Sequence, residues 1–397
     1  MTADPAYRVE VTAPDRQEES IVAIERDDVS VRELLNALAE GAPITRVPWK
    51  SSIAGMLGER LLRTTTGPLG RSTGRAVARG LALLTGVAIA ATGGLASART
   101  TGMSPSRLQR ANSPRLASSR RVTLATSPDQ AELASQLPMP RFYLATDDFT
   151  ASEWAPARVL EAERRLVDGC RAVFAVSSGL ADALCERHNI PRDQITVLPN
   201  AVPAELIGAE PPIPHPQTGS RPVAGVLGSL SSRLRLDWLR EMVEATPWLQ
   251  WRFVGGIEQS ELAPGDRFHL RWLEQHPRCR FEGPRPYREL VKYATTLDVA
   301  VMPYSTRASN VIGSPSRLFA HLAAGHPILA TPGCNQVEEL AGSLVTTCDE
   351  PGALVAKLEQ LRAQQFDDGL HRARWELAQQ HTWTQRAELF RSTISKL

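Results

Sequence analysis

Short apolar runs alternate with amphipathic helical patterns along most of the chain, which predicts an α/β protein built on parallel strands. In the first half, the apolar runs predict strands at 21–24, 44–48, 122–126, 142–145, 172–176 and 195–198. Between them, the amphipathic patterns predict helices at 30–40, 155–167 and 179–187. Ser30 with Glu33 three residues later forms a capping box that would open the first helix, and Gly41 would end it.

The α/β pattern restarts after a proline-rich segment. Residues 203–222 contain six prolines and two glycines, a composition that sustains neither a helix nor a central strand. Further strands are predicted at 223–227, 251–254, 280–282, 299–303, 328–330 and 344–346, with a helix from about Asp237. We therefore expect two Rossmann-like halves, with ligands at the carboxyl ends of the strands in the cleft between them.

The charge of the chain is distributed unevenly. The 45 Lys and Arg residues nearly balance the 43 Asp and Glu residues, giving a net charge of +2. Residues 50–121, however, hold twelve basic residues and one acidic residue, a net charge of +11, and the rest of the chain therefore carries −9. The near-zero total excludes a uniformly basic polyanion-binding protein, and the uneven distribution predicts a basic insert in the first half.

A stretch without charges lies inside this basic insert. Residues 80–98 approach the length of a membrane span, but Ala, Gly, Thr and Ser dominate them. We favour a packed helix over an interfacial one, and an interfacial helix over a transmembrane one. The flanking arginines suit an anionic lipid surface, whereas a solvated basic loop is the alternative for residues 99–121.

The cysteines and the N-terminal residues indicate a reducing compartment. None of the five cysteines lies in a C-x-x-C pair, so neither a disulfide framework nor a zinc motif is expected. Residues 1–10 lack the apolar core of a secretory signal. These features predict a cytoplasmic protein.

A glycine motif follows the first strand of the second half. Gly225 and Gly228 form a G-x-x-G before a predicted helix, where backbone N–H groups of Gly228 and Ser229 could approach a phosphate. Neither G-x-G-x-x-G nor G-x-x-x-x-G-K-[ST] occurs, which weakens dinucleotide-oxidoreductase and P-loop interpretations.

An ordered series of further motifs extends over residues 122–397. Its members are Val176–Leu180, Val197–Val202, Phe281–Leu290, Leu297–Tyr304, Ser314–Phe319, Ala323–Thr331 and His381–Trp383. With this series, the chain resembles the GT-B glycosyltransferases, in particular family 4-like enzymes and bacterial exopolysaccharide glucuronosyltransferases. The resemblance implies a GT-B fold, two Rossmann-like domains facing a central cleft with a C-terminal helix crossing back to the first domain. The implied units are an acceptor domain at 1–205 containing the insert 50–121, a sugar-nucleotide domain at 206–380, and a crossover helix at 381–397.

The resemblance implies a donor site in the second domain. Arg317 stands where the family has a Lys or Arg contacting the donor diphosphate, and a guanidinium fork suits phosphate oxygens. Tyr304 follows a strand end, and the loop 283–287 resembles the nucleobase pocket. The expected donor-binding residues are Gly228, Ser229, Arg233, Pro284, Arg285, Tyr287, Tyr304, Ser316, Arg317, Leu318 and His321. The alternatives are a surface arginine at 317, a packed tyrosine at 304 and a structural histidine at 321.

Carboxylates in the first half are candidates for catalysis and acceptor binding. Tyr143–Asp147 matches the Y-x-x-[ST]-D pattern of similar enzymes, in which a carboxylate takes the proton of the acceptor hydroxyl. Asp147 is the candidate base and Asp148 the second choice, with a turn-capping Asp148 as the alternative. Asp27 and Asp28 could hold the acceptor. No D-x-D motif occurs, so neither a metal nor a cofactor is expected.

Two departures from the family pattern bear on activity. Family 4 usually has a Glu where Ala320 stands, and a second acid at the position of Ile312. Their absence puts the usual retaining chemistry in doubt, although the glucuronosyltransferases also lack the first Glu. His321, beside Ala320, could contact the donor instead.

The favoured prediction is a glycosyltransferase of cell-envelope or exopolysaccharide synthesis. Its partners would be a nucleotide sugar (UDP- or GDP-linked), a lipid-linked or saccharide acceptor, and the anionic inner face of the cell membrane. The alternatives are a catalytically degenerate GT-B scaffold or partner subunit, and a nucleic-acid binder. The basic insert lacks the interleaved aromatic residues that single-strand binding requires, so no nucleic-acid partner is expected. A GT-B epimerase is disfavoured by the missing acids.

Overall fold

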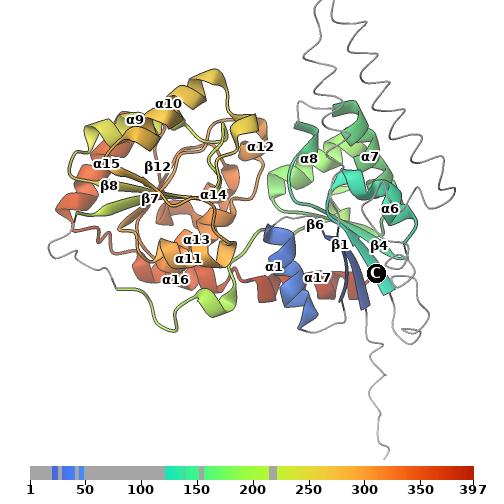
Figure 1. Cartoon of the computed structure of the whole chain (residues 1–397). Coiled ribbons are helices and arrows are strands. Elements are labelled where there is room, and N and C mark those ends of the chain that lie inside the picture. Colours follow the sequence, from blue (N-terminus) through green and yellow to red (C-terminus); the bar gives the residue numbers. More distant parts are fainter. Residues whose placement is uncertain are drawn as a thin grey trace, which may run out of the picture.

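Two parallel α/β domains make up the fold of the chain (Figure 1). The computed structural model describes residues 20–25, 29–40, 44–48, 121–137, 139–151, 156–213 and 221–397. Each domain has its own hydrophobic core, and each is built around a six-stranded parallel sheet.

The sheet of the first domain has the strand order β2-β1-β3-β4-β5-β6. Its strands are β1 (Ser20–Glu25), β2 (Ile44–Pro48), β3 (Arg121–Ala125), β4 (Arg141–Ala145), β5 (Ala172–Ala175) and β6 (Ile195–Val197). Its α-helices are α1 (Val29–Ala39), α6 (Ala131–Ser135), α7 (Pro156–Gly169) and α8 (Ser178–His188). Strands β4 and β5 are almost wholly buried, as expected for a sheet covered by helices on both faces.

The sheet of the second domain has the order β12-β11-β10-β7-β8-β9. Its strands are β7 (Val223–Leu227), β8 (Gln250–Val254), β9 (Cys279–Phe281), β10 (Val299–Met302), β11 (Ile328–Ala330) and β12 (Thr346–Thr347). Its helices are α9 (Leu236–Ala245), α10 (Pro264–Gln275), α11 (Tyr287–Ala294), α12 (Ala308–Val311), α13 (Ser316–Ala324), α14 (Asn335–Ala341), α15 (Pro351–Ala363) and α16 (His371–Gln379). Helices α9, α10 and α15 lie on one side of this sheet, and α11, α13 and α16 on the other (Figure 1).

The strand order of the second domain reverses between β7 and β10. The chain moves outward from β7 through β8 to β9, then returns to β10 and moves the other way. The loops after β7 and β10 therefore diverge at the carboxyl edge and leave a crevice there, which is the usual ligand site of such sheets.

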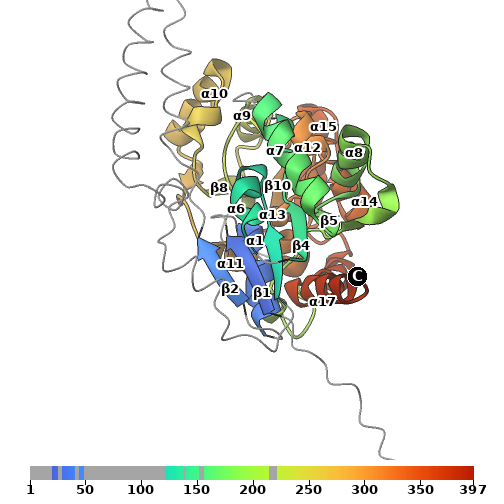
Figure 2. The same ribbon diagram turned by 90° about the vertical axis from the view of Figure 1, so that its right-hand side faces the viewer.

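The chain crosses between the domains twice, at neighbouring positions. Val202 leaves the first domain and pairs with Thr382, where the chain returns from the second. Helix α17 (Trp383–Ser395) then packs on the first domain beside α1 (Figures 1 and 2). Phe390 of α17 anchors it, with its ring centroid 4.8 Å from Phe174 and 6.2 Å from Phe142.

The predicted fold class is confirmed, with small errors at element ends. The predicted strand at 344–346 is wrong in its bounds, because 342–344 form a 3-10 turn and β12 begins at Thr346. Helix α1 begins at Val29, so Ser30 lies in its first turn instead of capping it. Asp27, Asp28, Gly41 and residues 50–120 of the basic insert lie outside the described residues. Within the part of the chain that is described, no helix has the length and apolarity of a membrane span.

Candidate active site

A pocket of ≈ 520 Å³ occupies the crevice at the carboxyl ends of β7, β8, β9 and β10. Its walls are the loops that follow these strands, together with the start of α13. The predicted donor residues that line it are Gly228, Ser229, Arg233, Pro284, Arg285, Tyr287, Tyr304, Ser316 and Arg317. The fold therefore brings together residues that are up to 89 positions apart in the sequence.

Glycines let the loops after β7 and β8 approach each other closely. Gly228 has a φ of +88°, which favours glycine. A Cβ on Gly255 would lie 2.0 Å from the carbonyl oxygen of Gly228, so no larger residue fits there. The Gly228 N–H donates to the Val254 carbonyl at 2.8 Å, which fixes the two loops against each other.

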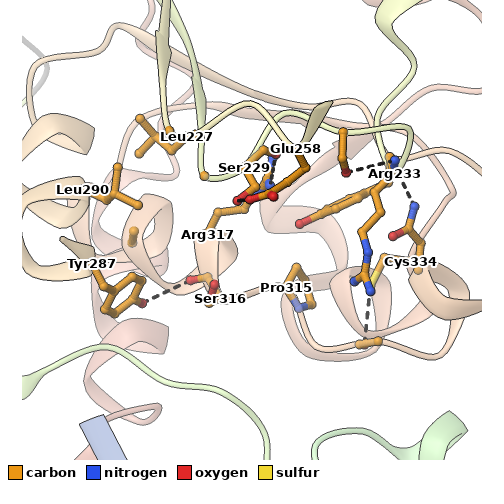
Figure 3. A pocket seen from close by; sticks show the side chains of 18 of the residues that line it. Leu227, Ser229, Arg233, Glu258, Tyr287, Leu290, Pro315, Ser316, Arg317 and Cys334 are labelled. Carbon is orange, nitrogen blue, oxygen red and sulfur yellow. Dashed lines mark hydrogen bonds between the residues drawn. The ribbon is translucent and has the colours of Figure 1, made fainter. Parts of the chain in front are cut away.

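Arg317 lies in the middle of the pocket wall (Figure 3). Its Nη2 donates to the Ser229 carbonyl at 3.2 Å, and its guanidinium carbon lies 5.2 Å from the centre of the Tyr304 ring. Its Nη1 is buried and has no hydrogen-bond partner. A buried guanidinium N–H without a partner is costly, so the Arg317 guanidinium, which lines the pocket, is suited to an anionic ligand.

The position of Arg317 on its helix adds to the positive potential. Helix α13 begins at Ser316 after Pro315, so Arg317 occupies the first turn. The first N–H groups of a helix have no partner within it and attract negative charge. The N-terminus of α13 and the Arg317 guanidinium therefore lie together at one part of the pocket wall.

Arg233 contributes a second guanidinium from the loop between β7 and α9. It lies on the other side of the pocket from Tyr287 and Leu290 (Figure 3). Its Nη2 donates to Oδ2 of Asp147 in the first domain at 2.5 Å. Although burial opposes it, the Asp147 carboxylate raises the pKa of Arg233 above its usual range.

The two tyrosines of the pocket are packed residues. Tyr287 donates its hydroxyl hydrogen between the carbonyls of Ala201 and Ser316, at 3.0 and 3.1 Å, and so joins the two domains. Burial raises the pKa of both Tyr287 and Tyr304, so both hydroxyls are protonated at neutral pH. Tyr304 supports Arg317 through its ring.

Two predicted donor residues do not line the pocket. Leu318 and His321 of α13 are completely buried in the second-domain core and do not reach the pocket surface. His321 instead contacts His326, with 3.1 Å between Nδ1 and Nε2. Burial and the neighbouring His326 lower its pKa, which keeps it neutral. The structure therefore does not bring these two residues together with the other predicted donor residues.

The first-domain carboxylates differ in their surroundings. Asp147 follows β4 and meets the pocket only through Arg233. Asp148 accepts the backbone N–H of Thr150 at 3.2 Å and the Arg187 guanidinium at 2.9 Å. Its carboxylate caps the following turn and does not line the pocket, so the second choice of base is not supported by the geometry.

The positions that lack the usual family acids have different roles here. Ala320 is buried at the floor of the pocket. Ile312 packs against the first domain, with its Cγ2 3.1 Å from the place where a Cβ on Gly179 would stand. Its carbonyl accepts a hydrogen bond from Ser177. The apolar side chain at position 312 therefore contributes to the contact between the two domains.

Sequence reasoning missed several residues of the pocket. They are Gly255, Gly256, Glu258 and Glu261 on the loop after β8, with Ser309, Asn310 and Cys334. The pair of glycines directly after a predicted strand was a signal that could have placed this loop at the site. In the part of the chain described, no cluster of three or more His, Cys, Asp or Glu is arranged to hold a metal ion.

This two-domain arrangement is the GT-B fold, which the solved structures named below share. The sequence profile of Glycosyltransferase Family 4 matches residues 146–206. The chain is 23% identical over 237 residues to the putative teichuronic acid biosynthesis glycosyltransferase TuaH of Bacillus subtilis (strain 168). The alignment covers 58% of each protein, so the chain spans less than two thirds of that relative.

Solved GT-B structures share the fold over nearly the whole chain. Sucrose-phosphate synthase of Thermosynechococcus elongatus matches with a TM-score of 0.60 and 15% identity, over 96% of this chain and 100% of that one. Anabaena HepE in complex with UDP-glucose matches with a TM-score of 0.60 and 16% identity, over 95% of this chain and 100% of that one. At identities this low, the similarity to these structures shows only that the fold is shared.

Proposed function

We propose that the protein transfers a sugar from a nucleoside diphosphate donor to a lipid-linked or saccharide acceptor in cell-envelope or exopolysaccharide synthesis. The observation that carries this proposal is the buried, unpartnered Nη1 of Arg317 in the pocket at the strand switch point. The same fold in HepE is solved with UDP-glucose, and TuaH is described as a teichuronic acid glycosyltransferase. Both support the proposal.

The chemistry of the donor half follows from charge. When the glycosidic bond to the donor breaks, negative charge accumulates on the departing diphosphate. Arg317 and the N-terminus of α13 stand where this charge would develop, and preorganised donors of this kind are a large source of rate acceleration. We infer that these groups, with Arg233, take the place of a metal ion in this reaction.

The first domain would supply the acceptor side. Asp147 is a first-domain carboxylate that reaches a residue of the pocket, through its 2.5 Å contact with Arg233. In this proposal it accepts the proton of the attacking acceptor hydroxyl. Asp27 and Asp28 remain candidates for holding the acceptor.

The basic insert suggests where the protein works. Its net charge of +11 would attract the insert to anionic phospholipid, at the inner face of the membrane where lipid-linked acceptors lie. Co-sedimentation with vesicles of phosphatidylglycerol, and not with vesicles of phosphatidylcholine, would support a peripheral membrane protein.

A nucleotide panel tests the donor site. We expect UDP or GDP to bind the full chain in calorimetry and to raise its melting temperature, with dTDP as a third ligand. Arg317→Ala should weaken binding about tenfold or more, because it removes hydrogen bonds to a charged group. Arg280→Gln is the matched control, since Arg280 is exposed and pairs with Glu282 outside the pocket. The proposal fails if none of the three nucleotides binds.

A degenerate GT-B protein that binds the nucleotide without transferring sugar is the second candidate. It is favoured by Ala320 and Ile312, which replace the usual acids. Release of UDP from UDP-sugars in the presence of membrane extract separates the two. We expect release by the wild type and its loss in Asp147→Asn, and nucleotide binding without any release would favour the degenerate protein.

A further inference from the structure

An ion pair between the two domains joins the candidate base to the donor pocket. Arg233 belongs to the second domain and Asp147 to the first, and their side chains are 41% and 30% exposed. The pair uses Nη2 of the guanidinium and Oδ2 of the carboxylate. The other carboxylate oxygen, Oδ1, accepts the backbone N–H of Asp148 at 2.9 Å.

The backbone on the Arg233 side is firmly held. The Arg233 carbonyl accepts hydrogen bonds from the Asn310 side chain at 2.7 Å and from the Ser305 backbone at 2.8 Å. Asn310 is buried, which protects its bond from water. The long side chain of Arg233 is therefore the part of this residue that reorients at least cost.

The backbone on the Asp147 side is held as well. The neighbouring Asp148 binds Arg187, which in turn donates to the completely buried carboxylate of Glu163 at 2.8 Å. Tyr143 donates its hydroxyl hydrogen to the same Glu163 at 3.0 Å. With both backbones held by hydrogen bonds, rotation of the arginine side chain is enough to open the pair.

The two guanidiniums of the pocket, those of Arg317 and Arg233, differ in whether a carboxylate pairs with them. Arg317 has an unpartnered buried nitrogen, whereas Arg233 is neutralised by Asp147, with Glu261 and Tyr304 also facing it. A diphosphate that enters the pocket meets Arg317 directly. It must compete with Asp147 for Arg233, and partly exposed ion pairs are weak enough for phosphate oxygens to displace them.

We propose that Arg233 passes from Asp147 to the donor diphosphate, so that donor binding frees the Asp147 carboxylate for the acceptor hydroxyl. This inference rests on the proposed function. Without donor, the candidate base is occupied by Arg233 and cannot take a proton. With donor, the same guanidinium stabilises the diphosphate. The donor must therefore bind before the acceptor can react.

A double-mutant cycle on UDP binding tests the competition. Calorimetry on the full chain compares the wild type with Asp147→Asn, Arg233→Gln and the double variant. We expect Asp147→Asn to bind UDP about two- to fivefold more tightly, because the ion pair no longer competes. Arg233→Gln should bind UDP more weakly, and adding Asp147→Asn to it should change the affinity less than twofold.

Matched variants separate this effect from general loss of charge. Asp182→Asn removes a first-domain carboxylate that pairs with Arg192 on the surface, and should leave UDP affinity unchanged. Arg235→Gln removes a cation two positions from Arg233 that pairs with Asp237 outside the pocket, and should also leave it unchanged. Circular dichroism and the melting temperature establish that each variant is folded.

The outcomes distinguish this inference from the proposed function. If the wild type binds UDP and Asp147→Asn binds it equally or more weakly, the transfer of Arg233 is refuted while the donor site stands. If Asp147→Asn tightens UDP binding equally with and without Arg233, the transfer of Arg233 is also refuted. The effect would then come only from removing the repulsion between the Asp147 carboxylate and UDP. Absence of UDP, GDP and dTDP binding by the wild type would overturn both proposals.

Discussion

Gly228 holds the loop after β7 in a conformation that an alanine would disturb in two separable ways. Its φ of +88° is unfavourable for a residue with a Cβ. A Cβ at this position would also lie 2.9 Å from Nη2 of Arg317. The first effect acts on stability, whereas the second acts on the guanidinium that we expect to bind the diphosphate.

The magnitudes follow from these two contacts. A left-handed backbone costs an L-residue about 1–2 kcal/mol, and the lower entropy of the unfolded alanine chain returns about 0.4–1 kcal/mol. We therefore expect Gly228→Ala to lower the free energy of unfolding by about 1 kcal/mol. The Arg317 guanidinium must move by roughly 0.5 Å or more to restore ordinary contact, which is enough to impair a binding geometry. UDP affinity should fall about tenfold.

Urea unfolding and UDP calorimetry measure the two effects separately. Tryptophan fluorescence reports mainly on the second domain, which holds five of the eight tryptophans. Gly265→Ala is the control, because a Cβ there meets nothing within 4 Å in the first turn of α10. We expect it to bind UDP normally and to be as stable as the wild type or up to about 1 kcal/mol more stable.

A second glycine provides the contrast. A Cβ on Gly255 would meet a backbone oxygen instead of a flexible side chain, so Gly255→Ala should cost about 3 kcal/mol of stability. If Gly228→Ala binds UDP as tightly as the wild type, the position of the Arg317 guanidinium does not determine nucleotide binding. Such a result would refute the role of Arg317 in binding the diphosphate.

Three further substitutions test the scaffold by urea unfolding. Arg374 is 1% exposed and pairs with Asp368, so Arg374→Ala should lower the free energy of unfolding by about 3–5 kcal/mol, and a loss below 1 kcal/mol would contradict a buried pair. Phe390→Ala should cost about 3–5 kcal/mol by opening a cavity beside Phe174, and should make α17 sensitive to protease in native conditions. Burial lowers the pKa of His326 to about 3, so the folded state binds fewer protons than the unfolded state below pH 6.5. The free energy of unfolding should therefore fall by about 1.4 kcal/mol per pH unit as the pH drops from 6.5 toward the folded-state pKa of about 3. His326→Asn should flatten this dependence on pH.

The sheets could be predicted from the sequence because their strands are continuous apolar runs bounded by turns. Val299–Met302 is buried at every position and was found almost to its bounds, as was Val223–Leu227. β12 was misplaced because it has only two residues and neither is buried. Its pairing with β11 depends on tertiary contact, which local patterning does not contain.

A site residue could be predicted from the sequence where its side-chain type indicates its chemistry and a motif indicates its position in the fold. Arg317 meets both conditions. Leu318 is the next residue along the helix and points into the core, because successive residues of a helix point in different directions. His321 lies one turn beyond Arg317, where it is buried against His326. The Arg233–Asp147 pair could not be predicted, since it depends on how the two domains face each other.

The loop before α13 is held in place by residues of the first domain. Asn200 donates its side-chain N–H to the Ser314 carbonyl at 2.7 Å, and its backbone N–H bonds the Ser314 hydroxyl at 3.1 Å. Ser177 donates to the Ile312 carbonyl from the same domain. This loop leads directly into Arg317, so a shift of the first domain moves the start of α13. The apolar Ile312 adds to that contact by packing against the first-domain core. The pocket lies in one domain, but the backbone that positions its central arginine is held by both.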